Sequence, residues 1–565
     1  MKKFFFIFKT LLYTFIFLGI FNISYSKASE FNYNAKSISN YFSGLIYFDD
    51  LDFVESEKVF KKLKNFEEKS TKYSSKFMHS LINLGKYKEA HKYSKKLENK
   101  NKSNFESNLF LGLYEFKEKN YVNAKSYFDR LENNYRHQLI FEVLQMSLNS
   151  WTEIAISKDK EKIQLINMPY TGYRNIVLIQ KVFANCYLGT SNTFNEFERI
   201  TQSNKSNFSR YHFFFANYLL NNKRKEESKN FINSASKKFP GNLLINQFKK
   251  NLENKDRNNF EFDCANSSNI MAEIFYIYAN ALSSQGDYKL SNFYINLSKF
   301  LNPKFMSYDA LLAENFFILK KNNEAKLFYE KLSKLGSTYK WYAAKKISVI
   351  LDEENKDSIN FLSKSYNEIE PGIYDTFDFA NFLRGKEVYE KAINLYTQLL
   401  TKIEKSHELF PKILERRGMA YERSDKWNLA EKDLLMSLKV LPKEPYVMNY
   451  LAYSWVEKNK NIETALNMLR EANRIKKNDG YITDSLGWVL YKLKNFSEAK
   501  LYLEKAIILM PQDPVVNDHF ADCLWMNNNK LQARYFWKNV LKLKNADKEL
   551  KNKVEKKLLL GLQSI

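Results

Sequence analysis

A regular repeat in the last third of the chain constrains its fold more than any other feature. Ala465, Ala499 and Ala533 are evenly spaced, with a period of about 34 residues. Each is followed four positions later by a large apolar residue and seven positions later by a smaller one, namely Leu469, Leu503 and Trp537, and then Ala472, Ala506 and Val540. A fixed period of this length predicts stacked helical hairpins, because one such unit cannot bury its apolar face alone.

The residues inside each repeat fit two antiparallel helices that cross closely. Small residues, such as Gly487 on the first helix and Ala499 on the second, let the two backbones approach, while Leu503 fills the volume beside the crossing. Pro511 cannot continue a helix and therefore marks the turn to the next repeat. The sequence thus predicts an all-α fold, with an array of about a dozen hairpins that forms an α-solenoid.

Further copies of the template divide the chain. They centre on Leu111-Gly112, Phe215-Ala216, Leu312-Ala313 and Gly418, and the stretches near 140–176 and 338–372 are degenerate but helix-like. Between residues 251 and 270 the period breaks and the chain is polar and Asn-rich, which favours a linker. We expect a divergent N-terminal array over 29–250, the polar linker over 251–270, a C-terminal array over 271–547 and a terminal capping helix over 548–565.

Residues 1–28 have the order of a secretory signal peptide. Lys2 and Lys3 precede an apolar stretch from Phe4 to Ile23, and Ser26-Lys27-Ala28 places small residues at positions −3 and −1 of a cleavage site. We expect cleavage after Ala28 and a periplasmic chain. The alternative is an uncleaved N-terminal membrane anchor, because the stretch counted from Phe4 reaches spanning length. No cysteine lies near the site, so a lipid anchor is not expected.

The net charge of +24 does not point to nucleic acid. Lys58, Lys61 and Lys62 are interleaved with Glu55 and Glu57, and this mixture is typical of solvated helix faces. A nucleic-acid footprint instead gathers basic residues on one face. We expect no nucleic-acid partner, while weak contact with an anionic membrane or cell-wall surface stays open.

The three cysteines are Cys186, Cys264 and Cys523. Because the cysteines are few, odd in number and far apart, the chain is not a small scaffold held together by disulfides. One bridge is open in an oxidising compartment, but the interpretation that we favour is isolated buried thiols.

The repeats resemble those of secreted tetratricopeptide repeat (TPR) proteins over almost all of the chain after residue 28. Three blocks, Tyr446–Trp455, Asp479–Tyr491 and Asp513–His519, are similar to a group found in alphaproteobacteria, although Ala452 stands where such blocks usually carry Gly. The group is similar in layout to an envelope lipoprotein that scaffolds a carboxy-terminal processing protease. The resemblance implies a right-handed superhelix that binds protein, and the missing lipobox cysteine argues against the same anchoring.

No pattern of catalytic or metal-binding residues stands out. The six histidines are scattered, and no H-E-x-x-H, C-x-x-C, G-x-G-x-x-G, Walker A or G-x-S-x-G pattern occurs. His519, Asp518 and Asp522 could be drawn as an acid-base or metal cluster, but no further His or Cys lies nearby to complete a zinc site. We interpret them as solvated groups on an inner helix, and expect no enzyme, no cofactor and no metal.

Family geometry places positions 2, 5, 9 and 12 of each first helix in the concave groove. In the last three repeats these positions hold Val515 and the candidate partner-binding residues Tyr446, Asn449, Tyr453, Tyr481, Asp484, Trp488, Tyr491, Asp518, Asp522 and Trp525. Aromatic side chains flanked by acids and amides suit peptide capture. The alternative is that neighbouring hairpins bury these rings. Trp455 and Trp537 fall on core positions and are expected to be structural.

The sequence therefore predicts a non-enzymatic scaffold or adaptor of the bacterial envelope. It would capture a partner segment in the groove, from a periplasmic protease or an envelope-assembly factor. On this hypothesis, replacing Trp488 and Trp525 by Ala weakens capture without unfolding the array. The alternatives are a protein that binds the cell wall or a membrane surface, and a carbohydrate-active enzyme on a helical superhelix. The latter lacks room for a catalytic domain, since the repeats reach within about 20 residues of the end.

Overall fold

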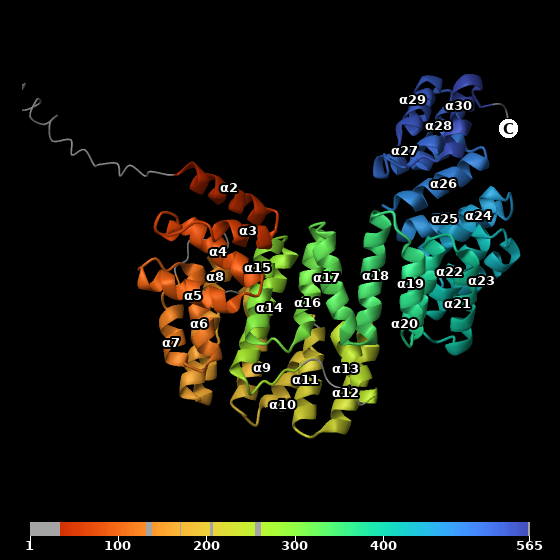
Figure 1. Cartoon of the computed structure of the whole chain (residues 1–565). Helices are drawn as coiled ribbons and strands as arrows, with labels where there is room; N and C mark the ends of the chain where they lie inside the picture. Colours follow the sequence, from red (N-terminus) through yellow and green to blue (C-terminus); the bar gives the residue numbers. More distant parts are fainter. Residues whose placement is uncertain (1–33, 132–137, 170, 204–206, 255–260, 563–565) are drawn as a thin grey trace, which may run out of the picture. The chain divides into compact units, whose positions relative to one another are not determined.

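The computed structural model describes residues 34–562, except 132–137, 170, 204–206 and 255–260 (Figure 1). The predicted signal peptide lies outside these residues. The described residues form helices and no strand, which confirms the all-α fold. They fall into two compact units, unit 1 ending at Glu354 and unit 2 beginning at Asn355. Among the described residues, no helix combines the length and the hydropathy that a membrane crossing requires.

Unit 1 contains α2 to α18. Their bounds are α2 Ala35–Asp49, α3 Phe53–Phe60, α4 Thr71–Asn83, α5 Tyr87–Asn99, α6 Phe105–Lys117, α7 Tyr121–Phe128, α8 Gln138–Ser157, α9 Arg174–Tyr187, α10 Thr193–Gln202, α11 Ser209–Asn221, α12 Lys225–Lys238, α13 Leu243–Asn254, α14 Ser267–Ser284, α15 Tyr288–Leu301, α16 Asp309–Ile318, α17 Asn322–Leu332 and α18 Ser337–Glu353. Short 3-10 turns lie at Phe66–Glu68, Lys160–Leu165, Thr171–Tyr173, Met306–Tyr308 and Ser333–Leu335.

Unit 2 contains α19 to α30. Their bounds are α19 Ser358–Asn367, α20 Ile373–Gly385, α21 Tyr389–Lys402, α22 Phe410–Arg423, α23 Trp427–Val440, α24 Pro445–Glu457, α25 Ile462–Ile475, α26 Gly480–Lys492, α27 Phe496–Leu509, α28 Pro514–Met526, α29 Lys530–Lys542 and α30 Lys548–Leu560. From α20 to α29 consecutive helices pair into hairpins, and first helices contact one another in the pairs α20 with α22, α24 with α26, and α26 with α28.

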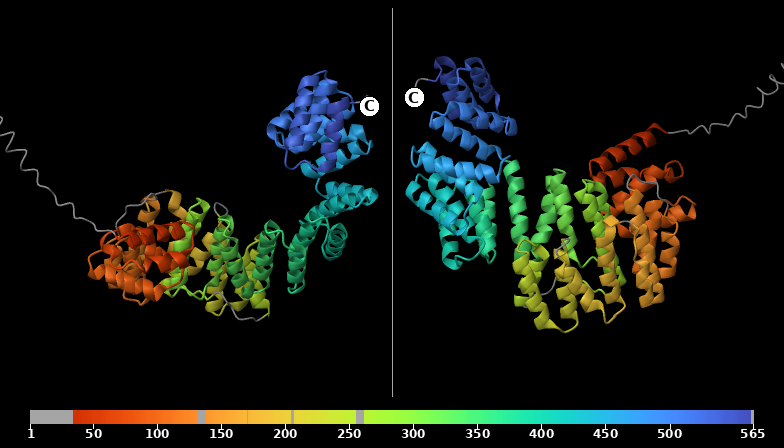
Figure 2. Two further views of the ribbon diagram at one scale, coloured as in Figure 1. Left: turned by 45° about the horizontal axis from the view of Figure 1, so that its top comes forward. Right: turned by 180° about the vertical axis from the view of Figure 1, so that it is seen from behind.

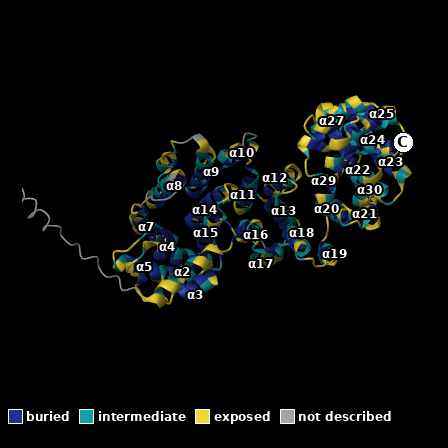
Figure 3. Ribbon diagram, turned by 90° about the horizontal axis from the view of Figure 1, so that it is seen from above, coloured by how far each residue is buried: buried dark blue, intermediate teal, exposed yellow. Residues whose placement is uncertain are grey.

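The hairpins follow from the small residues of the repeat. A Cβ atom on Gly487 of α26 would lie 2.6 Å from Cγ of Leu503 on α27, so a larger residue would force the two helices apart. Buried residues occur along the helices of both units (dark blue in Figure 3), and Ala499, Leu503 and Trp537 are all buried. We call the face formed by the first helices the inner face.

Aspartates at equivalent positions cap the N-termini of the first helices of the last repeats. Asp479, Asp513 and Asp547 follow one another by one repeat period, and each accepts a hydrogen bond from a backbone N–H of the first turn of α26, α28 or α30. A side-chain oxygen there satisfies an N–H group that the helix leaves without a partner. Helix α30 therefore occupies the register of a further first helix, and its Val554 is buried against the array.

The boundary between the units differs from the predicted linker at 251–270. That stretch lies wholly inside unit 1, where it covers the end of α13 and a return connection to α14. Its Phe262 is buried, and the Phe262 ring packs 4.5 Å from that of Phe214, centroid to centroid. Polar composition misled because Asn side chains of this stretch hold the backbone: Asn269 accepts a hydrogen bond from the N–H of Asp263 at 3.0 Å, and Asn266 accepts one from the N–H of Ser268 at 2.9 Å.

A disulfide between Cys186 of α9 and Cys264 fixes the same connection. The prediction of isolated thiols is therefore wrong for these two cysteines, whereas Cys523 is free and buried. The two cysteines are separated by 78 residues, and the repeat period says nothing about the return of the chain that brings them together.

Candidate functional site

The inner face of unit 1 is covered by helices of the same unit. Helices α14 and α15 contact α4, α6 and α8, and in Figures 1 and 2 the green helices lie against the orange ones. The His79 ring stacks 4.0 Å from that of Phe293. The Tyr87 hydroxyl donates to the carbonyl of Asn296 at 2.8 Å. Because α15 residues fill the space where a partner segment would lie, this part of the face is closed.

An ion pair further along unit 1 joins helix α11 to helix α14. Arg210 of α11 binds Glu273 of α14 through two hydrogen bonds of 2.7 and 2.9 Å. The guanidinium lies 3.9 Å from the Tyr276 ring centroid. Burial raises the pKa of Glu273, and the charge of Arg210 opposes that rise. Such a two-pronged pair fixes the position of one helix against the other.

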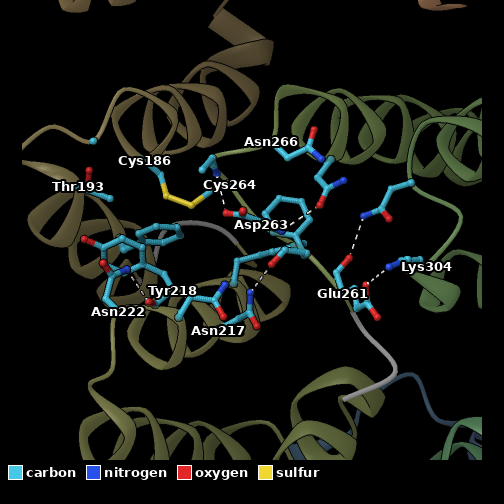
Figure 4. Close-up of a pocket in the computed structure, with 18 of the residues that line it drawn as sticks. Cys186, Thr193, Asn217, Tyr218, Asn222, Glu261, Asp263, Cys264, Asn266 and Lys304 are labelled. Carbon is cyan, nitrogen blue, oxygen red and sulfur yellow. Dashed lines mark hydrogen bonds and ion pairs between the residues drawn. A yellow bond between two sulfur atoms is a disulfide. The ribbon is translucent and has the colours of Figure 1, made fainter. Parts of the chain in front are cut away.

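A cavity of about 950 Å³ lies beside the return connection (Figure 4). Its wall includes the disulfide and several amides and acids. These groups hold the connection: Asn302 donates to the carbonyl of Glu261 at 3.0 Å, and Lys304 binds the Glu261 carboxylate at 2.7 Å. The cavity therefore reflects how the connection is held, and we assign it no ligand.

The inner face of the last three hairpins of unit 2 carries a row of exposed side chains. Tyr446, Tyr481 and Val515 occupy position 2 of α24, α26 and α28. They are 49%, 61% and 42% exposed. Two aromatic rings and one aliphatic side chain at equivalent positions of successive hairpins form an apolar line that a partner can reach.

Deeper on the same face, position 5 of α26 pairs with α28. Asp484 accepts a hydrogen bond of 2.9 Å from Nδ1 of His519, and both side chains are buried. Burial alone would lower the pKa of His519, but Asp484, Asp518 and Asp522 raise it above its ordinary value. The other carboxylate oxygen of Asp484 has no hydrogen-bond partner among the described residues. The pair thus ties two neighbouring hairpins together.

Trp488, predicted as a groove anchor, is buried and only 8% exposed. Its ring stacks on His519 at 3.8 Å and on Tyr491 at 4.8 Å, and its indole N–H donates to Glu457 at 2.7 Å. The neighbouring hairpins bury the ring, as the alternative interpretation held. We therefore expect Trp488→Ala to destabilise unit 2, in contrast to the expectation from sequence.

Asp518 and Asp522 are buried and bound to the terminal helix, so their interpretation as solvated groups is wrong. Lys557 of α30 lies 2.7–2.8 Å from both carboxylates. Trp537 also donates to Asp522 at 2.9 Å. Burial and the neighbouring Asp518 raise the pKa of Asp522 to about 6, although Lys557 opposes the shift. The described residues hold no group of three or more acids, histidines and cysteines fit to bind a metal ion.

The remaining predicted residues are half-buried or buried. Asn449 and Tyr453 lie on α24 and are half-buried, Tyr491 is buried, and Trp525 is half-buried. The Trp525 ring packs 5.2 Å from that of Trp537, centroid to centroid, and lies so close to Gly561 that a Cβ atom added there would be 2.4 Å from the ring. All ten residues lie on the first helices α24, α26 and α28, and among them only Tyr446 and Tyr481 are exposed.

Sequence reasoning missed Lys557 and the pairing of His519. The signal for Lys557 was available, because Asp547 follows Asp513 by one repeat period and so places α30 in the register of a first helix. The pairing of His519 with Asp484 depends on contact across two hairpins, which the period alone does not specify.

No family model matches the chain. TPR repeat-containing protein PA4667 of Pseudomonas aeruginosa is 27% identical to it over 103 residues, or 18% of this chain and 18% of that protein. The chain therefore matches less than a fifth of the length of this curated relative. The repeat period, its close glycine crossings and its helix pairs agree with the repeat in that relative's name. The hairpins resemble tetratricopeptide repeats.

Solved TPR structures resemble the chain only in outline. Yeast Tom70 is 14% identical, with 83% of this chain and 96% of that chain aligned at a TM-score of 0.36. The APC/C hetero-tetramer Cut9–Hcn1 is 13% identical, with 93% and 90% aligned at 0.34. TTC0263 of Thermus thermophilus is 17% identical, with 34% and 100% aligned at 0.29. The overall agreement is low, and nothing about function follows from it.

Proposed function

We propose that this TPR protein is a non-enzymatic scaffold that captures a segment of a partner protein on the inner face of α24, α26 and α28. The observation that carries the proposal is the exposed row of Tyr446, Tyr481 and Val515. Exposed aromatic side chains supply large contact area at low entropic cost, and such residues dominate protein-binding hot spots. The position 2 row is therefore the first contact for the partner.

The buried residues beneath the row hold the helices in place and are not the first to contact the partner. Asp484 with His519, and Asp518 and Asp522 with Lys557, lock neighbouring helices at fixed spacing. A rigid inner face lowers the entropic cost of binding, because it is ordered before the partner arrives. The predicted groove residues thus divide into exposed contacts and buried positioning residues.

The proposed location is the periplasm. The order of charged, apolar and small residues at 1–28 supports export. The disulfide between Cys186 and Cys264 also supports it, because such bonds persist in oxidising compartments. Tyr446–Trp455 and Asp479–Tyr491 resemble an alphaproteobacterial group that is similar in layout to an envelope scaffold of a carboxy-terminal processing protease. This resemblance favours a periplasmic protease as the partner, and an envelope-assembly factor is the second candidate.

The test is a crosslinking pull-down from envelope extract with the full chain and two variants. Tyr446→Ala with Tyr481→Ala removes the aromatic row, and Tyr535→Ala removes a similarly exposed tyrosine from the outer helix α29. We expect the double variant to lose the partner, and Tyr535→Ala to retain it. Equal recovery with all three chains would contradict the assignment of the inner face. If the recovered proteins depend on the row but include no protease, the envelope-assembly factor becomes the favoured partner.

A further inference from the structure

The C-terminal end of the array exposes apolar side chains at one corner. Two contacts bring the helix ends together: Arg534 of α29 donates to the carbonyl of Leu558 on α30 at 2.6 Å, and Gly561 lies against the Trp525 ring. Leu559 and Leu560 follow Leu558 directly, Leu531 lies one turn before Arg534, and Met526 follows Trp525. We call Met526, Leu531, Leu559 and Leu560 the C-terminal corner.

These side chains are more exposed than a packed helix end requires. Leu531 is 87% exposed, Leu559 80% and Leu560 68%, and Met526 is also exposed. On α30 the two leucines lie away from the buried Val554, which packs against the array. Exposed apolar side chains at the ends of three helices, Met526 on α28 and leucines on α29 and α30, mark an interaction surface.

Helices α29 and α30, with the turn between them, carry an excess of positive charge. Residues 530–560 contain ten Lys and Arg and three Asp and Glu. Lys556 is exposed one turn before both Leu559 and Leu560, and Lys530 is exposed next to Leu531. The nearest acidic residue along α30 is Glu555, one turn before Leu559, whereas Glu549 is paired with Lys553. This pattern differs from the interleaved charges of the rest of the chain.

We propose that the C-terminal corner docks on an anionic phospholipid surface. Leucines at the end of a helix, with lysines beside them, are suited to the boundary between headgroups and acyl chains. Each basic residue near an anionic membrane adds attraction that a neutral membrane does not provide. The surface would hold unit 2 at a membrane while the inner face of α24, α26 and α28 stays free for a protein. The inference is independent of the proposed function.

The experiment measures binding of the full chain to vesicles of phosphatidylglycerol with phosphatidylcholine and to vesicles of phosphatidylcholine alone. The quantity compared is the ratio of the two affinities, because the apolar segment from Phe4 to Ile23 contributes to both. The first variant carries Leu559→Ser and Leu560→Ser, and the second carries Lys530→Gln and Lys556→Gln. The control carries Leu501→Ser and Ile508→Ser, which alter two exposed apolar residues of α27.

We expect the wild-type chain and the control to prefer anionic vesicles by the same ratio. The lysine variant should lose roughly 25-fold in that preference, at about fivefold for each lysine. The leucine variant should weaken binding to anionic vesicles by about tenfold or more.

Two results would overturn the proposal. In the first, the leucine variant binds anionic vesicles as the wild type does, which would leave only general attraction to a positive chain. In the second, the leucine variant changes the mass of the chain in light scattering but not vesicle binding, which would make the corner a contact between two copies. Circular dichroism of each variant verifies that the helices are intact.

Discussion

The two units use the same kind of hairpin but differ in what lies on the inner face. In unit 1, α14 and α15 cover the first helices of the N-terminal repeats, and a buried ion pair and a disulfide fix the return of the chain. In unit 2, the corresponding face carries the exposed row of Tyr446, Tyr481 and Val515. Unit 1 thus shows a repeat array that is closed where the chain folds back onto it, and we propose unit 2, where the row stays exposed, as the unit that binds a partner.

The largest effect is expected from breaking the ion pair in unit 1. Arg210→Ala leaves Glu273 buried without its charge partner, so the free energy of unfolding of unit 1 should fall by about 3–5 kcal/mol. Denaturant unfolding, followed by hydrogen exchange of α11 and α14, measures it. Arg474→Ala, which breaks an exposed pair with Glu471 in unit 2, is the control and should leave exchange unchanged. Equal effects of the two variants would contradict a buried bridge.

An effect of similar size is expected in unit 2 from Trp488→Ala. The ring is buried between His519 and Tyr491, so its removal should cost about 3–5 kcal/mol of unfolding free energy. Tyr481→Ala on the same helix should leave stability unchanged and weaken partner binding by about tenfold. Thermal unfolding and a binding assay on both variants distinguish a core ring from a contact ring. If the Trp488→Ala variant were as stable as the wild type, Trp488 would not be a core residue, and its role as a partner-binding residue would be favoured again.

Loss of the disulfide should have an intermediate effect confined to unit 1. Cys264→Ser opens a loop of 78 residues, and we expect a loss of about 2–4 kcal/mol. Hydrogen exchange should increase in α9 and at the start of α14, while α24 to α29 stay as in the wild type. Cys523→Ser, at the free cysteine of unit 2, is the matched control. Faster exchange throughout both units would contradict their independence.

The smallest effect is a pH dependence of unit 2. The pKa of His519 lies above its value in the unfolded chain, and the pKa of Asp522 is raised to about 6. Protonation of either group therefore favours the folded state. The contribution of Asp522 is present at about pH 4 and lost as the pH rises through about 6. That of His519 is present below about pH 6.5 and lost above it.

Unit 2 should therefore become less stable as the pH rises from about 4 to 8. Asp484→Asn removes the carboxylate that binds His519 and should flatten the dependence above about pH 6.5. Denaturant midpoints at several pH values, followed through exchange in α26 and α28, measure this. An unchanged pH profile in Asp484→Asn would show that the pair does not set the histidine's protonation.

The sequence allowed prediction of the hairpins and of the first helices that carry the candidate residues, because both follow from the spacing of Ala465, Ala499 and Ala533. The return of the chain in unit 1 could not be predicted, since the contact of Cys186 with Cys264 joins segments that share no period. The burial of Trp488 depends on His519 of the next hairpin. Position within a repeat alone therefore did not separate a core ring from an exposed one.

The most direct test of the account compares equivalent positions of the two inner faces in one experiment. Lys72 of α4 and Tyr481 of α26 both occupy position 2 of a first helix and are both exposed. A photo-reactive side chain is introduced at each in the full chain, followed by illumination in cells and mass spectrometry of the adducts. The account predicts a discrete protein adduct from position 481 and none from position 72. The same adduct from both positions, or one from position 72 alone, would contradict it.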